Sequence, residues 1–132
     1  MKVLLADDSV LILDRLQQML GAFEQVEIVA TCKNGLDTLN ALKTLKPDLA
    51  IVDIKMPGIS GLEVLSEIRK VDKVLKFIIL TFYSSDSYRQ LAIKAGVDHF
   101  ISKVDDFEKV SLLVADMLKH PNRQSNIITS LI

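Results

Sequence analysis

A short apolar run at residues 49–52 that ends on Asp53 constrains the fold of this chain more than any other stretch. Four consecutive apolar residues, with β-branched Ile51 and Val52 among them, are typical of a strand buried on both faces, as in a parallel sheet covered by helices. In such sheets ligands bind just beyond the carboxyl ends of the strands. Asp53 is therefore better placed for chemistry than for packing, although a lone aspartate there would more often only cap the strand.

The residues after Asp53 predict an exit loop and then a helix. Pro57 pre-sets a turn, and Gly58 and Gly61 allow backbone angles that other residues avoid. Apolar residues at helical spacing continue from near Ser60, so a helix is expected directly behind the loop.

The same alternation of strand and helix patterns runs through the rest of the chain. Further apolar runs of the strand type lie at residues 3–6, 26–30, 77–80 and 97–101. Helical stripes lie at residues 10–20, 35–45, 62–71, 86–95 and 107–117. One of them has Leu36, Leu39, Leu42 and Leu45 at three-residue steps, which we interpret as core and not as a zipper. This alternation predicts an α/β fold, a doubly wound five-stranded parallel sheet with helices on both faces.

Composition and charge exclude several function classes. A chain of 132 residues with 49% hydrophobic and 25% charged residues is expected to form one globular domain. Its formal net charge of −1 argues against nucleic acid or an anionic membrane as the main partner. No apolar run approaches the roughly 18 residues of a membrane span, so a reducing cytoplasm is the expected location. Cys32 cannot form an internal disulfide, and its spacing to His99 or His120 matches no metal or nucleophile motif.

Polar residues follow the predicted strands at the points where each strand ends. Asp7 and Asp8 follow the first run, Asp53 the third, Thr81 the fourth and Lys103 the fifth. Parallel strands deliver these side chains to one edge, where clustered carboxylates repel each other unless a cation relieves them. Mg²⁺ prefers carboxylate, water and phosphate oxygens, and an ammonium and a hydroxyl suit a phosphoryl group. The alternative interpretation is a charge-balanced, solvated rim.

The pattern resembles the receiver domains of two-component response regulators over residues 2–119. The resemblance rests on these motifs: Asp7 with Asp8, Asp53 followed by Met56, Pro57 and Gly58, then Thr81, Phe100 and Lys103. It implies a flavodoxin-like sheet in the strand order 2-1-3-4-5, with the ligand site between strands 1 and 3. As a set in this order and spacing, these motifs are highly specific.

The resemblance also implies a chemistry for the acids. Asp53 would accept a phosphoryl group, while Mg²⁺ would be held by Asp8, Asp53 and Asp7, the last through water. Lys103 and the metal would offset the charge on the phosphoryl oxygens. The chain would then be a signalling receiver that catalyses its own phosphotransfer, with its own dephosphorylation as a further option, and not an enzyme.

A switch is implied as well. The added phosphate would draw in the Thr81 hydroxyl, and the ring of Phe100 would fill the space that Thr81 leaves. Signalling would then pass through the fourth helix, fifth strand and fifth helix. The outer faces of these two helices carry charges of both signs, on Arg89, Lys94, Lys109 and Asp116. Such faces leave open a two-fold homodimer in which the same surface of each copy meets the other.

Domain limits and partners follow from the same resemblance. We expect a receiver domain at residues 1–120 and a tail or linker at 121–132, which is too short for a DNA-binding helix-turn-helix domain. The expected partners are a histidine kinase or phosphotransfer protein and either a downstream target protein or an output domain outside this sequence, for example a DNA-binding one. No membrane partner is expected.

Two other functions compete with this interpretation. The first is a receiver-like domain that acts without phosphorylation, although the intact acid, hydroxyl and lysine set argues against it. The second is a phosphohydrolase with an aspartate nucleophile. Such enzymes generally carry Asp-x-Asp after the first strand, whereas Asp7 and Asp8 are adjacent here and no insertion is large enough for a substrate cap.

The sequence departs from the usual receiver pattern near two motifs. Phe82 stands after Thr81 where a small residue is usual, and residues 104–106 follow Lys103 where a proline is common. Lys55 and Tyr83 lie two residues beyond the acceptor and the hydroxyl. Together with Phe82 they are expected to crowd the path of an attacking water and to slow loss of the phosphate.

Overall fold

The computed structural model describes residues 1–121, so that nearly all of the predicted tail at 121–132 lies outside the described residues. The strands are β1 (Lys2–Ala6), β2 (Glu27–Cys32), β3 (Leu49–Val52), β4 (Lys76–Thr81) and β5 (His99–Ser102). The helices are α1 (Val10–Leu20), α2 (Gly35–Leu45), α3 (Gly61–Arg69), α4 (Asp86–Ala95) and α5 (Lys109–Lys119). Strands and helices alternate along the chain, as the apolar pattern predicts.

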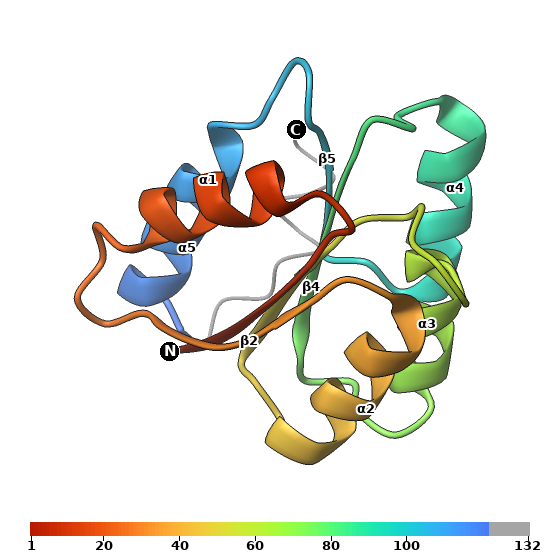
Figure 1. Ribbon diagram of the computed structural model, residues 1–132, viewed down its shortest axis with the longest axis horizontal. Helices are drawn as coiled ribbons and strands as arrows, with labels where there is room; N and C mark the ends of the chain where they lie inside the picture. Colours follow the sequence, from red (N-terminus) through yellow and green to blue (C-terminus); the bar gives the residue numbers. More distant parts are fainter. Residues whose placement is uncertain (122–132) are drawn as a thin grey trace.

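All strands pair in parallel in one sheet of order β2-β1-β3-β4-β5, which confirms the predicted topology. Helices α1 and α5 cover one face of the sheet, and α2, α3 and α4 cover the other (Figure 1). Each face has its own buried apolar cluster, and the central strand β3 is buried along its whole length. Because helices pack on both faces, the strands are held firmly, and the relative positions of their ends are fixed.

Two strands differ from their predicted bounds by two residues at one end, and the other strands by no more than one. The second strand starts at Glu27 and runs on to Cys32, because it pairs with β1 as far as the Ala6 end. The fifth starts at His99, two residues after the predicted start at Val97. The N–H of Val97 donates to the carbonyl of Ala92 at 3.1 Å and so still belongs to the cap of α4. Local hydrophobicity could not separate this cap from the strand.

The leucine stripe of α2 is only half buried. Leu39 and Leu42 are in the core, but Leu36 and Leu45 are 58% and 41% exposed. A helix turns about 100° per residue, so each three-residue step falls short of a full turn by about 60°. Four leucines at this spacing spread over half the helix surface, and the prediction that all four are core is wrong for the outer pair.

The loop behind β3 depends on two glycines for different reasons. Gly58 has a φ of +81°, as the turn pattern predicts. Gly61 has no unusual backbone angle and begins α3, but an added Cβ would lie 2.0 Å from the carbonyl oxygen of Asp53. Its glycine is needed for close approach, and not for the backbone freedom that the sequence suggested. A capping box between Ser60 and Glu63 then starts α3 directly beside Asp53.

Candidate functional site

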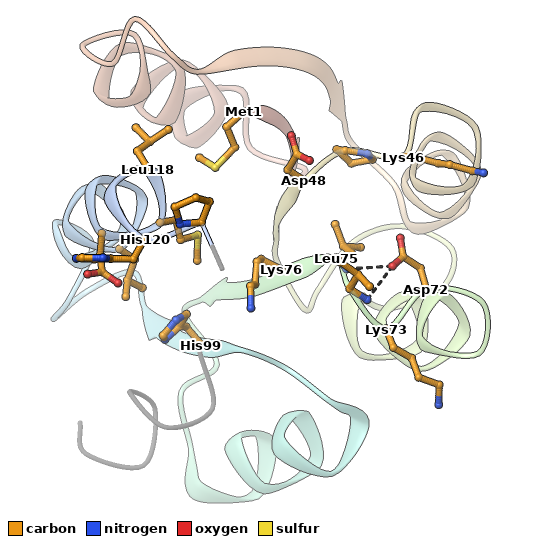
Figure 2. A pocket seen from close by; sticks show the side chains of 16 residues that line it. Met1, Lys46, Asp48, Asp72, Lys73, Leu75, Lys76, His99, Leu118 and His120 are labelled. Atoms are coloured by element: carbon orange, nitrogen blue, oxygen red, sulfur yellow. Dashed lines mark hydrogen bonds between the residues drawn. The ribbon is translucent and has the colours of Figure 1, made fainter. Parts of the chain in front are cut away.

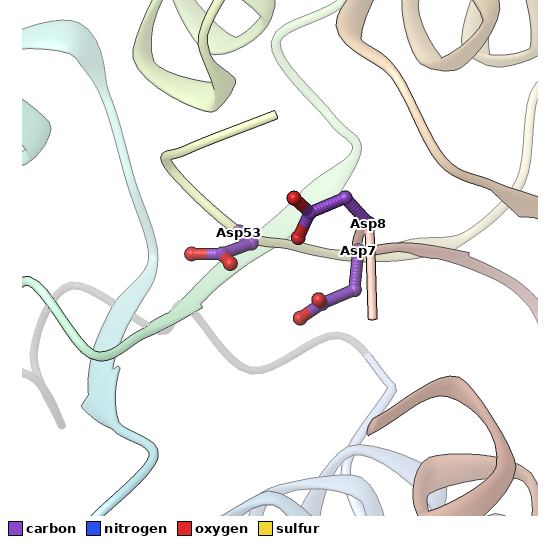
Figure 3. Close-up of side chains that lie close together, drawn as sticks. All are labelled: Asp7, Asp8 and Asp53. Atoms are coloured by element: carbon purple, nitrogen blue, oxygen red, sulfur yellow. The ribbon is translucent and has the colours of Figure 1, made fainter. Parts of the chain in front are cut away.

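The predicted acids meet at the carboxyl edge of the sheet. β1 and β3 are neighbours with Ala6 opposite Val52, and the N–H of Asp53 donates to the carbonyl of Ala6 at 3.0 Å. Asp7 and Asp53 therefore follow two adjacent strand ends, and Figure 3 shows the carboxylates of Asp7, Asp8 and Asp53 gathered on one side of these ends. The sequence prediction that these acids lie together is confirmed.

The three carboxylates form a group that suits a divalent cation. One oxygen from each of Asp7, Asp8 and Asp53 lies within 4.8 Å of the others. Asp7 and Asp53 are buried, whereas Asp8 is exposed. Hard carboxylate oxygens with one side open to water are the donor set that Mg²⁺ prefers, since this ion keeps part of its water shell. The residues present therefore fit the ion that the sequence predicts.

Lys103 joins the cluster as its cation. Its Nζ lies 2.6 Å from Oδ2 of Asp7 and 2.8 Å from Oδ2 of Asp53, and its side chain is 2% exposed. Burial alone would lower the pKa of Lys103, but its hydrogen bonds to Asp53 and Asp7 and their charges outweigh burial and raise it. The ammonium therefore stays charged between two buried carboxylates.

The remaining carboxylate oxygens are held by the backbone. Oδ1 of Asp53 accepts the N–H of Ile54 at 2.7 Å, and Oδ1 of Asp7 accepts the N–H of Ser9 at 2.9 Å. Burial nevertheless raises the pKa of Asp7, and the hydrogen bond from Lys103 opposes this only in part. Both buried carboxylates are thus fixed in orientation by donors on two sides.

Thr81 and Phe100 lie on the next two strands. Thr81 is the last residue of β4 and fully buried, and its Oγ1 accepts the N–H of Tyr83 at 3.1 Å. Phe100, in β5, is 8% exposed. The guanidinium of Arg89 lies 4.7 Å from the Phe100 ring centroid and donates to the Phe100 carbonyl at 3.4 Å. Arg89, which the sequence suggested only as an outer charge, is therefore packed on the predicted switch residue.

The three residues predicted to crowd the site take part in two separate sets of contacts. Nζ of Lys55 lies 5.3 Å from the ring centroid of Tyr83 and 5.5 Å from that of Tyr88, and the two rings are 6.0 Å apart in an edge arrangement. A hydrogen bond to Tyr88 raises the pKa of Lys55. The ring of Phe82 instead lies over Lys103, with its centroid 4.8 Å from Nζ.

An arginine that was not among the predicted site residues joins three segments of the chain. Arg69, the last residue of α3, forms an ion pair of 3.0 Å with Asp98, just before β5. It also donates to the carbonyls of Gly96, Asp72 and Leu75 at 3.0, 3.2 and 2.7 Å. Asp98 in turn accepts the N–H of Phe77 in β4 at 2.7 Å. Only its place in the last turn of a helix marked Arg69 in the sequence.

The remaining candidates lie apart from the acids. Cys32 ends β2 at the carboxyl edge, and burial raises its pKa. His99 begins β5 and so lies at the opposite edge, where a hollow of about 870 Å³ is lined by residues that include His99 and His120 (Figure 2). The cysteine and the histidines are therefore not brought together, and Asp7, Asp8 and Asp53 do not line the hollow.

Comparison with known proteins gives the family. The model of the response regulator receiver domain matches residues 3–117. The chain is 34% identical over 119 residues to the chemotaxis protein CheY of Halobacterium salinarum, covering 89% of this chain and 96% of that protein. It is 33% identical over 116 residues to the transcriptional regulatory protein DesR of Bacillus subtilis, covering 88% of this chain.

A solved structure of a response regulator is similar to this chain in fold and sequence. A DNA-binding response regulator of the LuxR family from Staphylococcus aureus superposes with a TM-score of 0.78 at 32% identity, covering 87% of this chain and 96% of that chain. The chain belongs to the response regulator receiver domain family of two-component systems. It spans 57% of the length of DesR. Within residues 1–121 no helix is both long and apolar enough to cross a membrane.

Proposed function

We propose that this receiver accepts a phosphoryl group on Asp53, from a histidine kinase, a phosphotransfer protein or a small phosphodonor. The observation that carries the proposal is the ion-paired cluster, in which Lys103 bridges Asp53 and Asp7 at the end of the central strand. A structural salt bridge alone would not need a third acid, yet Asp8 is exposed beside it. Three carboxylates and one ammonium leave an excess of negative charge, which suits a bound cation.

In the proposed transfer an oxygen of Asp53 forms the new bond to phosphorus. The bond from phosphorus to the donor's leaving atom breaks, and its electron pair goes to the donor, which takes a proton from solvent or from its own protonated group. Lys103 can leave Oδ2 of Asp53 and follow the phosphoryl oxygens, because Asp7 holds its ammonium within reach. The backbone N–H of Ile54 keeps the other Asp53 oxygen oriented.

Asp7, Asp8 and Asp53 would hold Mg²⁺ at this site. When bound, the ion supplies positive charge that stabilises the phosphoryl oxygens during transfer. Asp8 offers the exposed carboxylate, so it is the member of the group that a partly hydrated ion reaches most easily. The buried pair, Asp7 and Asp53, is already neutralised in part by Lys103.

The proposed output is a change in protein contacts. The Thr81 hydroxyl, at the end of β4, would turn to the phosphate and release the N–H of Tyr83 that it now binds. Phe100 would then follow into the vacated space, and Arg89 would move with its ring. A partner protein, an output domain or a second copy of the chain would read this change on α4, β5 and α5.

The proposed receiver has defined bounds, and two other functions are less compatible with the structure. We place the receiver at residues 1–120 and the tail or linker from 121 on. A receiver that acts without phosphorylation would have no need for the ion-paired cluster of Asp7, Asp53 and Lys103. A phosphohydrolase would need a binding site for its substrate beside Asp53, and the described hollow of about 870 Å³ lies at the other edge of the sheet.

The test is the intact mass after incubation with acetyl phosphate and Mg²⁺. Wild type is expected to gain one phosphoryl group, and to lose the gain when the metal is chelated. Asp53→Asn is expected to gain none. The matched control is Asp48→Asn, which changes an aspartate at the opposite end of the same strand. Equal labelling of wild type and Asp53→Asn would contradict the proposal.

A further inference from the structure

The contact between Phe82 and Lys103 is a feature that the proposed function leaves unexplained. Phe82 is the first residue after Thr81, and it is 58% exposed although it lies beside a buried ion-pair network. Its ring centroid lies 4.8 Å from Nζ of Lys103, within the range of a cation–π contact. One side of the ring therefore covers the ammonium while much of the side chain remains in water.

The Lys103 ammonium is surrounded by two carboxylates and the Phe82 ring. An ammonium has three N–H donors. The carboxylates of Asp7 and Asp53 accept from Nζ at 2.6 and 2.8 Å, and Phe82 lies over it as well. Lys103 follows the end of β5, and its side chain is 2% exposed. The two carboxylates and the ring together surround an ammonium whose side chain has almost no access to solvent.

We propose that Phe82 is a positioning residue, a ring that holds the Lys103 ammonium on Asp7 and Asp53 and must move aside before phosphoryl oxygens or water can reach it. This inference rests on the proposed function and deepens it, because it assigns control of access to one residue. A small anionic donor cannot displace the ring by apolar contact. Phe82 therefore slows transfer from small phosphodonors and favours a protein donor with an apolar surface.

The position of Phe82 in the chain links this cap, the Phe82 ring over Lys103, to the proposed switch at Thr81 and Phe100. It follows Thr81 directly, and the Thr81 hydroxyl binds the backbone N–H of Tyr83 on the other side of Phe82. Rotation of Thr81 toward a phosphate would break this hydrogen bond and free the backbone on both sides of the ring. The cap is therefore held in place by the same hydroxyl that the proposed switch uses.

The first readout needs no phosphate. The exchange of the Lys103 ammonium protons with water can be measured by NMR on protein with ¹⁵N-labelled lysine, without Mg²⁺, and the signal is assigned by its loss in Lys103→Arg. We expect exchange to be about tenfold faster in Phe82→Ala than in wild type, with Phe82→Leu between them because it keeps apolar cover without a ring face. Tyr83→Ala is the control, since that ring contacts Lys55 and Tyr88.

The second readout is the initial rate of labelling by acetyl phosphate with Mg²⁺. Phe82→Ala is expected to be labelled several-fold faster than wild type. Exchange in Phe82→Ala within twofold of wild type would overturn the cap, and so would faster exchange without faster labelling, because access would then be controlled elsewhere. If no variant takes up phosphate, wild type included, the proposed function fails, while the proton exchange still decides whether Phe82 covers Lys103.

Discussion

Adjacent residues of the acid cluster have opposite environments. Asp7 is buried and forms an ion pair with Lys103, whereas Asp8 is exposed. Burial raises the pKa of Asp7, because its effect outweighs that of the hydrogen bonds that Asp7 accepts. Such a difference between neighbours follows from a chain that leaves a strand, where successive side chains point to opposite sides. We therefore propose different roles for the two acids: Asp7 holds the Lys103 ammonium, and Asp8 would meet a cation that arrives from solvent.

This division predicts unequal effects on Mg²⁺ binding. Asp8→Ala is expected to weaken binding by tenfold or more, and Asp7→Asn by less, because Lys103 already occupies one oxygen of Asp7. Calorimetric titration of the unphosphorylated protein measures both. Asp14→Ala, a change on α1 outside the cluster, is the control. If the affinity of Asp8→Ala equals that of wild type, the cluster does not hold the ion in the way we propose.

A buried histidine predicts the pH dependence of stability. Burial lowers the pKa of His99 below its usual 6.5; Asp98 and Asp116 act in the opposite sense and Lys76 in the same sense. As the pH falls through 6.5, the unfolded chain takes up a proton before the folded one does, so the free energy of unfolding decreases. One proton contributes at most about 1.4 kcal/mol per pH unit.

Urea unfolding between pH 7 and 5, as rough bounds around the usual histidine value, tests this sign. Wild type is expected to lose more stability across this range than His99→Gln, in which the glutamine keeps polar atoms but does not titrate. His120→Gln removes an exposed histidine and serves as the control. A wild type that gains stability on acidification relative to His99→Gln would show that the sign is wrong.

At the scale of the elements, α3 is tied to its neighbours by Arg69. Its guanidinium bonds to Asp98, to the carbonyl that ends α4 at Gly96, and to the loop between α3 and β4. A guanidinium presents several donors in a fixed plane, so lysine cannot reproduce this set. The ion pair is 15% and 16% exposed, and solvent therefore screens it little.

Arg69→Ala is accordingly expected to lower the free energy of unfolding by about 2–4 kcal/mol, because Asp98 loses its paired cation and three backbone carbonyls lose a side-chain donor. Arg69→Lys is expected to recover less than half of this loss. The control is Lys70→Ala at the next position, where the ion pair with Glu67 is exposed to solvent and contributes little to stability. Equal losses in Arg69→Ala and Lys70→Ala would refute the linking role of Arg69.

The elements also show which features a sequence can reveal. The strand ends at Asp7, Asp53 and Lys103 were predictable, because apolar runs mark buried parallel strands and every such strand ends at the same edge. The link made by Arg69 and the cover over Lys103 were not, since both depend on side-chain directions between segments far apart in the chain. Periodicity likewise identified α2 but misjudged its outer leucines, because a three-residue step drifts around the helix.

At the scale of the whole molecule, the proposed switch predicts a change in assembly. Exposed apolar side chains on α4, with Leu91 at 54% and Ile93 at 50%, lie on the element whose Arg89 packs on Phe100. We expect wild type with Mg²⁺ and beryllium fluoride, a phosphate mimic, to sediment as a dimer, while Asp53→Asn stays monomeric. Leu91→Glu should prevent the dimer, and Leu11→Glu on α1, where Leu11 is 80% exposed, should not. A wild type that stays monomeric with the mimic would remove dimerisation from the mechanism.

The proposal that Asp53 is the acceptor is tested most directly by locating the phosphoryl group in the sequence. Borohydride reduces an aspartyl phosphate to homoserine, so wild type labelled with acetyl phosphate and Mg²⁺, then reduced and digested with trypsin, records the acceptor in its peptides. We expect homoserine at Asp53, in the peptide that ends at Lys55, and unmodified Asp7 and Asp8 in the peptide that ends at Arg15. Homoserine at Asp7 or Asp8, or no homoserine in a protein that has gained phosphate, would contradict it.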